Sequence, residues 1–149
     1  MADFSFPYTS VSILPSAPYP QGQVLYRPLL IATLTASNGA SLRCIVLLDT
    51  GADACLFPLA LAIALGIDIF ALPRTMTGGV GTNSNVTYYD ELKVDLGNGI
   101  AFTASVGFTE GMNVHGYGLL GQDGFFSAYE VHFSHRQKVF TISTSSLNP

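Results

Sequence analysis

One carboxylate stands out because of where the sequence places it. Asp49 directly follows the apolar run 45–48 and precedes Thr50 and Gly51. Four large apolar residues in a row predict a strand that is buried on both faces. Because an aspartate at the end of such a strand is costly to leave without a partner, we interpret Asp49 as a residue that the protein uses. The Thr50 hydroxyl can bond to backbone, and Gly51 permits a tight turn.

Further motifs follow this loop in a definite order along the chain. They are the helix-forming stretch Leu59 to Gly66, the glycine-rich run 76–81 (MTGGVG) and the segment 118–123 (GLLGQD). In this order after the Asp49 loop, they resemble the retropepsins, the single-lobe aspartic proteases. The resemblance covers roughly Leu29 to Thr144 and is closer to bacterial or cellular members than to viral ones. It implies an all-β fold, a closed barrel or sandwich with a flap hairpin and one or two short helices.

The resemblance also assigns roles to individual residues. Asp49, Thr50 and Gly51 match the catalytic triplet, in which the Thr50 hydroxyl would bond across a dimer beneath the aspartates. The residues placed against substrate are Ala52, Asp53, Gly78, Gly79, Val80 and Gly81. Those placed behind the catalytic loop are Leu119, Leu120 and Gly121. The alternatives are that Asp53 caps a turn or helix and that the glycine run is an ordinary flexible loop.

Aspartic proteolysis needs two aspartates on either side of one water molecule. One carboxylate takes a proton from the water while the other, protonated, donates to the scissile carbonyl. The chain has a single Asp-Thr-Gly and no Asp-Ser-Gly, so the second Asp49 must come from an identical subunit around a two-fold axis. Two carboxylates so close share one proton, and we therefore expect activity at acidic to mildly acidic pH. The expected enzyme is an aspartic endopeptidase acting on peptide or protein substrates.

One position departs from the viral pattern. Viral retropepsins commonly carry an arginine where this chain has Gln122, and that arginine pairs with the acid that Asp53 matches. An amide can donate a hydrogen bond but cannot form a charge-assisted bidentate pair. We expect a dimer that is weaker than the viral ones or braced differently.

The composition agrees with one domain that associates with itself. The 149 residues suffice for a single domain with a core, which we place at 23–149. Four prolines within 1–22 predict an extended N-terminal arm with little regular structure. Only 11% of residues are charged and 48% are hydrophobic, so part of the surface should be an apolar subunit interface. The net charge of -4 argues against nucleic acid as a partner.

Membrane, metal and cofactor partners are not expected. The longest apolar stretch, Ala54 to Ile67, is shorter than the roughly 20 residues that a spanning helix needs. The chain does not open on a basic region followed by an apolar one, so we expect no signal peptide and a cytoplasmic location. Cys44 and Cys55 are interpreted as small buried hydrophobes rather than a disulfide. No third ligand accompanies His132 and His135, so we expect no metal site and no cofactor.

Strand signals dominate the segments that must position these motifs. Apolar, β-branched and alternating residues predict strands at 30–35, 42–48, 86–89, 92–96, 100–108, 131–134 and 138–142. Asn38-Gly39 and Gly97-Asn98-Gly99 predict turns between them. Residues 59–65 predict a helix that follows Pro58, ends at Gly66 and is apolar all round, so it should be buried or covered by a partner.

Two other functions remain open. The first is a catalytically silent retropepsin-like module that binds peptides or only dimerises. The second is an unrelated β-barrel binding domain in which Asp49 caps a turn. Because a silent module would be free to lose Asp49 or the flap glycines, and both are present, the sequence favours an enzyme.

Overall fold

The computed structural model of the chain describes residues 2–78, 84–114 and 116–144. Contacts divide it into two units, each of which is described by itself. The terminal unit combines Met1–Leu29 with Tyr129–Pro149, and the central unit is the continuous segment Leu30–Ala128. Strands predominate in both units, so the fold class is all-β, as the sequence predicts.

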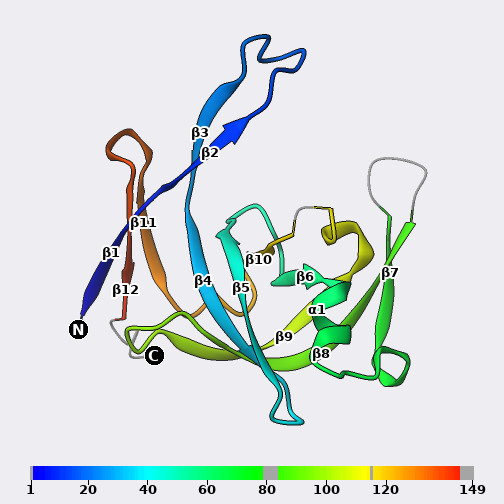
Figure 1. Cartoon of the computed structure of the whole chain (residues 1–149). Helices are drawn as coiled ribbons and strands as arrows, with labels where there is room; N and C mark the ends of the chain where they lie inside the picture. The colour runs from blue at the N-terminus through cyan, green and yellow to red at the C-terminus, as the bar shows by residue number, and fades with distance from the viewer. Residues whose placement is uncertain (1, 79–83, 115, 145–149) are drawn as a thin grey trace. The chain divides into compact units, whose positions relative to one another are not determined.

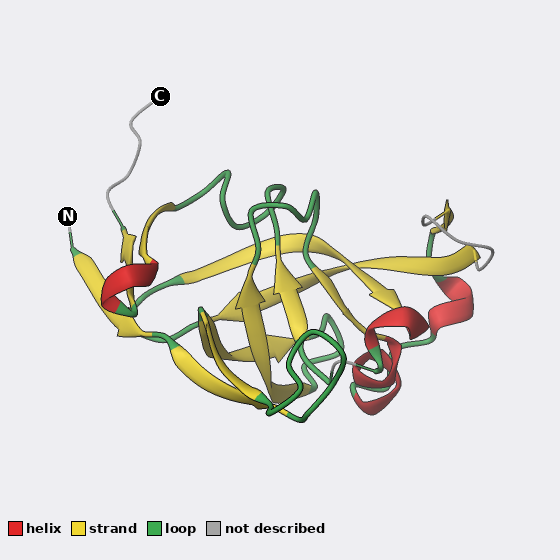
Figure 2. Ribbon diagram, turned by 90° about the horizontal axis from the view of Figure 1, so that it is seen from above, coloured by secondary structure: helices red, strands yellow, loops and turns green. Residues whose placement is uncertain are grey.

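The central unit is built on one seven-stranded sheet (Figures 1 and 2). The strand order is β4-β5-β10-β6-β9-β8-β7, and β4 also pairs with β8. The strands are β4 (Leu29–Thr35), β5 (Ser41–Leu48), β6 (Leu56–Pro58), β7 (Arg74–Gly78), β8 (Ser84–Asp95), β9 (Ala101–Thr109) and β10 (Gly118–Leu120). Because of the β4–β8 pairing, six strands close into a ring of pairings and β7 extends outside it. The two strands predicted at 86–89 and 92–96 are one continuous strand, β8.

The turns of this sheet form where the sequence predicts them. Gly39 has a φ of 85° in the turn between β4 and β5, a conformation that glycine adopts without steric cost. Asn38 supports this turn, since its Oδ1 accepts a hydrogen bond from the Ala40 N–H at 2.8 Å. Its Nδ2 donates to the Leu65 carbonyl at 2.9 Å. The Asn38 amide therefore joins the β4–β5 turn to the segment that follows the helix.

Strand β5, which leads to Asp49, is buried on one face only. Val46 and Leu48 are buried, but Ile45 is 47% exposed. The expectation of a strand buried on both faces was therefore wrong. Successive side chains of a strand point to opposite faces, and within the single chain only the Val46 face meets the core. That core includes Phe57 and Phe108, whose ring centroids lie 6.2 Å apart.

Short helices lie beside the sheet: α1 (Leu59–Ala64), and the 3₁₀ helices η1 (Ile69–Ala71) and η2 (Glu110–Met112). Helix α1 ends as predicted, because Gly66 has a φ of 71° and its N–H bonds to the Ile63 carbonyl, as in a glycine-capped helix end. Within the chain α1 is not buried all round, because Ile63 is 63% exposed. Coverage of this helix by a partner stays a prediction. A six-residue helix on the sheet buries only one side. Among the described residues, no helix combines the length and apolar character that crossing a membrane requires.

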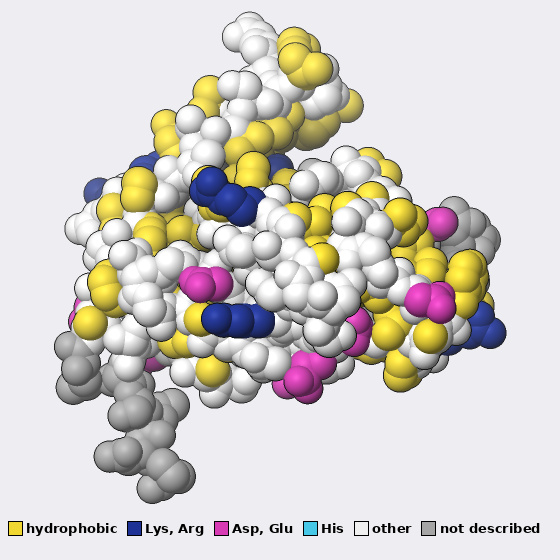
Figure 3. Space-filling view, turned by 60° about the horizontal axis from the view of Figure 1, so that its bottom comes forward, with side chains coloured by type: hydrophobic (Ala, Val, Ile, Leu, Met, Phe, Trp, Pro, Cys, Tyr) yellow, Lys and Arg dark blue, Asp and Glu magenta, His cyan; other side chains and the backbone are white. Residues whose placement is uncertain are grey.

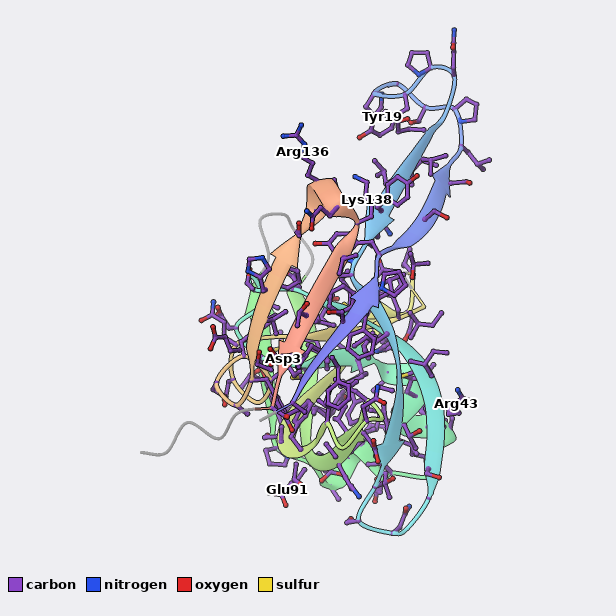
Figure 4. All side chains as sticks on the ribbon, turned by 90° about the vertical axis from the view of Figure 1, so that its left-hand side faces the viewer. Asp3, Tyr19, Arg43, Glu91, Arg136 and Lys138 are labelled. Carbon is purple, nitrogen blue, oxygen red and sulfur yellow. The ribbon has the colours of Figure 1, made fainter. Side chains whose placement is uncertain are left out.

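The terminal unit contains two small sheets. One has the order β1-β12-β11 and the other pairs β2 with β3. Their elements are β1 (Asp3–Pro7), β2 (Thr9–Ile13), β3 (Gln23–Arg27), β11 (Glu130–Ser134), the 3₁₀ helix η3 (His135–Gln137) and β12 (Val139–Ser143). In the first sheet the Phe6 and Phe140 rings stack with centroids 5.5 Å apart. The Lys138 ammonium lies 4.6 Å from the centroid of the Tyr26 ring, and both Lys138 and Arg136 lie near the end of the β11–β12 hairpin (Figure 4).

Two strands occupy the segment 1–22, where the prolines predicted little regular structure. That expectation was wrong because the prolines avoid the positions where they would break pairing. Pro7 is the last residue of β1, which lies at the edge of its sheet, where proline is tolerated. The others, Pro15, Pro18 and Pro20, lie in the connection between β2 and β3. The closing hairpin predicted at 131–142 is confirmed as β11 and β12.

Candidate active site

The Asp49 side chain is held by the turn that it begins. Asp49 follows β5, and its Oδ1 accepts a hydrogen bond from the Gly51 N–H at 2.9 Å. Its backbone carbonyl accepts from the Ala52 N–H at 3.1 Å. These two bonds fix the carboxylate relative to the loop backbone, as Asp side chains commonly do in turns. Asp49 is half-buried and Thr50 and Gly51 are exposed, so the loop presents the carboxylate at the surface of the chain.

Strand β10 and the residues after it support the loop from behind. β10 runs parallel to β5, with Leu119 opposite Leu47 and Leu120 opposite Leu48. The Asp49 N–H then donates to the Leu120 carbonyl at 3.0 Å. Beyond β10 the contacts continue: the N–H groups of residues 122 and 123 donate at 2.8 Å to the carbonyls of residues 52 and 53. Backbone hydrogen bonds therefore join the predicted support segment to the predicted catalytic loop at the start of the loop and again just after it.

Gly121 is the residue that permits this close approach. A Cβ atom at this position would lie 2.3 Å from the Ala54 carbonyl oxygen and 2.6 Å from that of Ala52. Both contacts are with backbone, which cannot move away without displacing the loop. Glycine is required wherever two backbones come this close. The role of Gly121 behind the loop follows from this contact.

Gln122 reaches the loop with its side chain. Its Nε2 donates to the Thr50 carbonyl at 2.9 Å, so a neutral amide braces the middle of the Asp-Thr-Gly turn. The sequence singled out Gln122 only as a departure from the viral arginine and did not predict this partner. The Asp53 side chain is exposed, and its backbone carbonyl accepts the bond from the Asp123 N–H. The sequence signal that could have indicated this hydrogen bond is a side-chain amide, that of Gln122, directly after Gly121.

The thiol of Cys55 lies beneath this region. Cys55 is fully buried, and its Sγ lies 3.7 Å from the Asp123 carbonyl, to which the thiol donates. Burial is the largest cause of the raised pKa of this thiol. Cys44, on β5, is also a free thiol, and burial raises its pKa to about 11. Both thiols are therefore protonated at neutral pH. Cys55 is buried as expected, whereas Cys44 is only half-buried.

The predicted flap corresponds to the hairpin of β7 and β8. These strands pair antiparallel, from Arg74 opposite Tyr88 to Gly78 opposite Ser84. Gly78 is the last residue of β7. Gly79, Val80 and Gly81, which the sequence places against substrate, lie outside the described residues.

The structure thus brings together the predicted catalytic triplet, the predicted support residues and two of the residues predicted to face substrate. Its members are Asp49, Thr50, Gly51, Ala52, Asp53, Leu119, Leu120 and Gly121. Within the described part of the chain there is no group of three or more His, Cys, Asp or Glu residues able to hold a metal ion. The chemistry available at the loop is that of a fixed, half-buried carboxylate beside backbone and hydroxyl groups.

Comparison with known proteins identifies the fold. No protein-family model matches the chain, and no curated protein matches it. Among solved structures, a retropepsin-like aspartic protease from Rickettsia conorii is similar with a TM-score of 0.57 and 18% sequence identity, over 89% of this chain and 98% of that chain. The EIAV protease complexed with the inhibitor HBY-793 matches with a TM-score of 0.44 and 20% identity, over 64% of this chain and 82% of that chain. On the first of these likenesses, the chain has a retropepsin-like fold.

Proposed function

We propose that the protein is an aspartic endopeptidase. Two Asp49 carboxylates, one from each chain of a homodimer, would hold the attacking water between them, one as general base and the other as general acid. The Rickettsia structure with the similar fold is described as an aspartic protease, which supports this chemistry.

The observation that carries the proposal is the fixed position of the Asp49 carboxylate. It is bonded to the Gly51 N–H, and the backbone at both ends of the loop is bonded to residues 120, 122 and 123. A general acid or base must be placed within hydrogen-bond reach of the proton that it transfers. A turn fixed on both sides keeps the carboxylate in place without rearrangement when a substrate arrives.

The chain supplies half of the proposed site. It contains one Asp-Thr-Gly, so the second carboxylate would come from another copy of the chain. Ile45, on the strand that leads to Asp49, is 47% exposed, and the whole chain has few charged residues. An apolar surface beside the loop is suited to a subunit interface. The β7–β8 hairpin would close over the bound peptide as a flap.

A peptide-library digestion tests the proposed chemistry. Purified protein is incubated at pH 4 to 7 with denatured protein or mixed peptides, and the products are identified by mass spectrometry. Asp49→Asn should lower the cleavage rate by roughly 10²- to 10⁴-fold, the usual contribution of a general acid or base. Asp95→Asn is the matched control, because Asp95 Oδ1 also accepts a hydrogen bond from the N–H two residues later, at 2.8 Å. If wild type and Asp49→Asn cleave alike, the aspartic mechanism is wrong.

Mixing chains tests the shared site. Wild-type protein is equilibrated with a fourfold excess of Asp49→Asn, and cleavage per wild-type chain is measured. If chains associate at random and a mixed pair is inactive, activity per wild-type chain should fall to about one fifth. Activity that is unchanged by the excess would show that each chain works alone. Dimers that bind peptides without cleaving them would instead identify a silent binding module.

A further inference from the structure

A hollow in the central unit lies outside the catalytic loop. Its volume is about 360 Å³, within the range of sites that hold small ligands or single large side chains. It is lined by Leu59 from α1, Ile69 and Phe70 from η1, Asn85, Val86 and Tyr88 from β8, and Glu110 from η2. Five of these seven side chains are apolar or aromatic. None of the residues assigned to catalysis or to substrate binding lines it.

The walls of the hollow are held in place by local contacts. Asp68 Oδ1 accepts the Phe70 N–H at 3.2 Å and so fixes the start of η1. Asn113 Oδ1, directly after η2, accepts the Ala60 N–H of α1 at 3.3 Å. The hollow is therefore formed by packed elements.

Large apolar side chains at this end of the unit remain exposed. Phe70, which lines the hollow, is 84% exposed, and Met76 is 66% exposed. Met76 lies opposite Val86 in the β7–β8 pairing, and opposite residues of a strand pair share one face. Figure 3 shows hydrophobic side chains gathered at the end of the unit where Figure 1 places β7, with acidic side chains beside them. An exposed apolar surface around a hollow is typical of a binding site.

Charge indicates what this surface binds. Glu110 is the ionisable carboxylate among the residues that line the hollow. The central unit, Leu30–Ala128, contains three Lys or Arg and eight Asp or Glu residues, a net charge of -5. A partner with positive charge is therefore attracted to this unit as a whole and to the rim of the hollow. Arg74 lies on β7, opposite Tyr88 of β8. Its positive charge is nearby and would repel such a partner.

We propose that this hollow is an exosite that binds a peptide segment with a large apolar side chain between basic residues. The apolar side chain would enter between Leu59, Phe70 and Val86, and a neighbouring lysine or arginine would lie beside Glu110. This rests on the proposed function, since the segment would belong to a protein substrate at a distance from its scissile bond. The hollow thus selects substrates by a feature that the catalytic loop does not contact.

Methyl NMR on the full-length Asp49→Asn protein tests this inference without cleavage of the probe. The probe is an acetylated, amidated Gly-Lys-Phe-Lys-Gly peptide, and the signals followed are the methyl groups of Leu59, Ile69 and Val86. We expect these signals to shift on titration at low salt. Gly-Glu-Phe-Glu-Gly and Gly-Lys-Ala-Lys-Gly peptides should bind at least several-fold more weakly, since each lacks one of the two recognised features.

Variants separate the contributions of charge and apolar contact. Glu110→Gln should weaken binding of the Lys-Phe-Lys peptide by about two- to fivefold, as expected for an exposed charge pair, and Arg74→Gln should strengthen it. Phe70→Ala should weaken it more than Glu110→Gln does, because it removes apolar contact area. The matched controls are Glu91→Gln, an exposed acid further along β8, and Ile31→Ala, which is 55% exposed on β4.

The outcomes distinguish this inference from the protease proposal. Unshifted Leu59, Ile69 and Val86 methyls, or equal binding of the Lys-Phe-Lys and Glu-Phe-Glu peptides, would overturn the exosite even if the wild type cleaves peptides. If the methyl NMR signals shift but the wild-type protein cleaves no peptide, the peptide-binding site is upheld and only its link to proteolysis is removed.

Discussion

The loop that carries Asp49 and the hairpin of β7 and β8 are held in opposite ways. The loop is bonded by backbone to residues 120, 122 and 123, braced by the Gln122 side chain and packed against Gly121 without room for a methyl group. Among the strands that the structure describes, β7 pairs with β8 alone, at the end of the sheet order, and Met76 on it is 66% exposed.

The difference fits the two tasks that aspartic proteolysis would set. A carboxylate that transfers protons must stay within a few tenths of an ångström of its position. A cover must open and close, so it needs few contacts to break. The chain places its tightest backbone contacts where position matters and leaves β7 as an edge strand.

The largest effect should come from Gly121→Ala. A methyl group there would collide with the backbone carbonyls of Ala52 and Ala54, so the loop must shift. We expect a loss of about 1 to 3 kcal/mol in stability and a larger loss of cleavage. Gly111→Ala is the matched control, because its nearest contact is the Asn85 amide, the end of a flexible side chain. Thermal melts measure the loss of stability, and digestion rates measure the loss of cleavage. Equal losses in the Gly121→Ala and Gly111→Ala variants would show that the loop is not tightly packed.

A smaller effect should follow from removing the amide brace. Gln122→Leu leaves the Thr50 carbonyl without its side-chain donor, which should cost about 1 kcal/mol and reduce kcat more than it raises KM. Gln122→Arg keeps a donor at this position and should retain more of both stability and kcat. Urea unfolding and steady-state kinetics provide the comparison. A Gln122→Leu variant that matches the Arg variant would show that the brace does not support the loop.

Alkaline pH should weaken β5, the strand that carries the loop. Burial raises the pKa of Cys44 from 9.0 to about 11, so on raising the pH the unfolded chain loses this proton first. The contribution to stability is fully present below pH 9 and is lost as the pH rises toward 11. The pKa values of Cys55 and Tyr8 are raised in the same direction, so Cys44→Ala should flatten the decline without abolishing it. Denaturation at pH 8 to 11 checks the difference between the two proteins, and parallel curves would contradict it.

The smallest effect should be that of Met76→Ala on the hairpin. An exposed side chain on an edge strand contributes little to folding, so the free energy of unfolding should change by no more than about 0.5 kcal/mol.

Hydrogen exchange extends the comparison, because the amides of Asp49, Gln122 and Asp123 should exchange more slowly than those of β7. Equal protection in both regions would show that the hairpin is held as firmly as the loop.

The local pattern of the sequence predicts the parts of the site that depend on backbone. Asp49 after an apolar run indicates a strand that ends in a turn, and the resemblance to retropepsins places the Gly-Leu-Leu-Gly segment behind that turn. Both are present as β5 and β10, paired in parallel. Gly39 and Gly66 mark a turn and a helix end because few other residues adopt their φ angles.

The rest depends on neighbours that are distant in sequence. Ile45 and Ile63 are as apolar as Val46 and Ala62, yet they are exposed because the core covers only one side of their elements. The first of the N-terminal strands forms because β12, at the other end of the chain, lies beside it. The Gln122 brace and the hollow beside Glu110 likewise need several elements in place before they exist.

The pairing of β1 with β12 sets an order of events during synthesis. Asp3 lies opposite Ser143, and the Thr144 N–H donates to the Ala2 carbonyl at 2.9 Å. While the ribosome is still making the chain, β1 has no partner, whereas the continuous segment that holds Asp49 and its support can already pair within itself. Contacts this far apart in sequence form slowly. β1 therefore completes its pairing only after β12 has been made, later than the strands around Asp49, which lie between the two in the sequence.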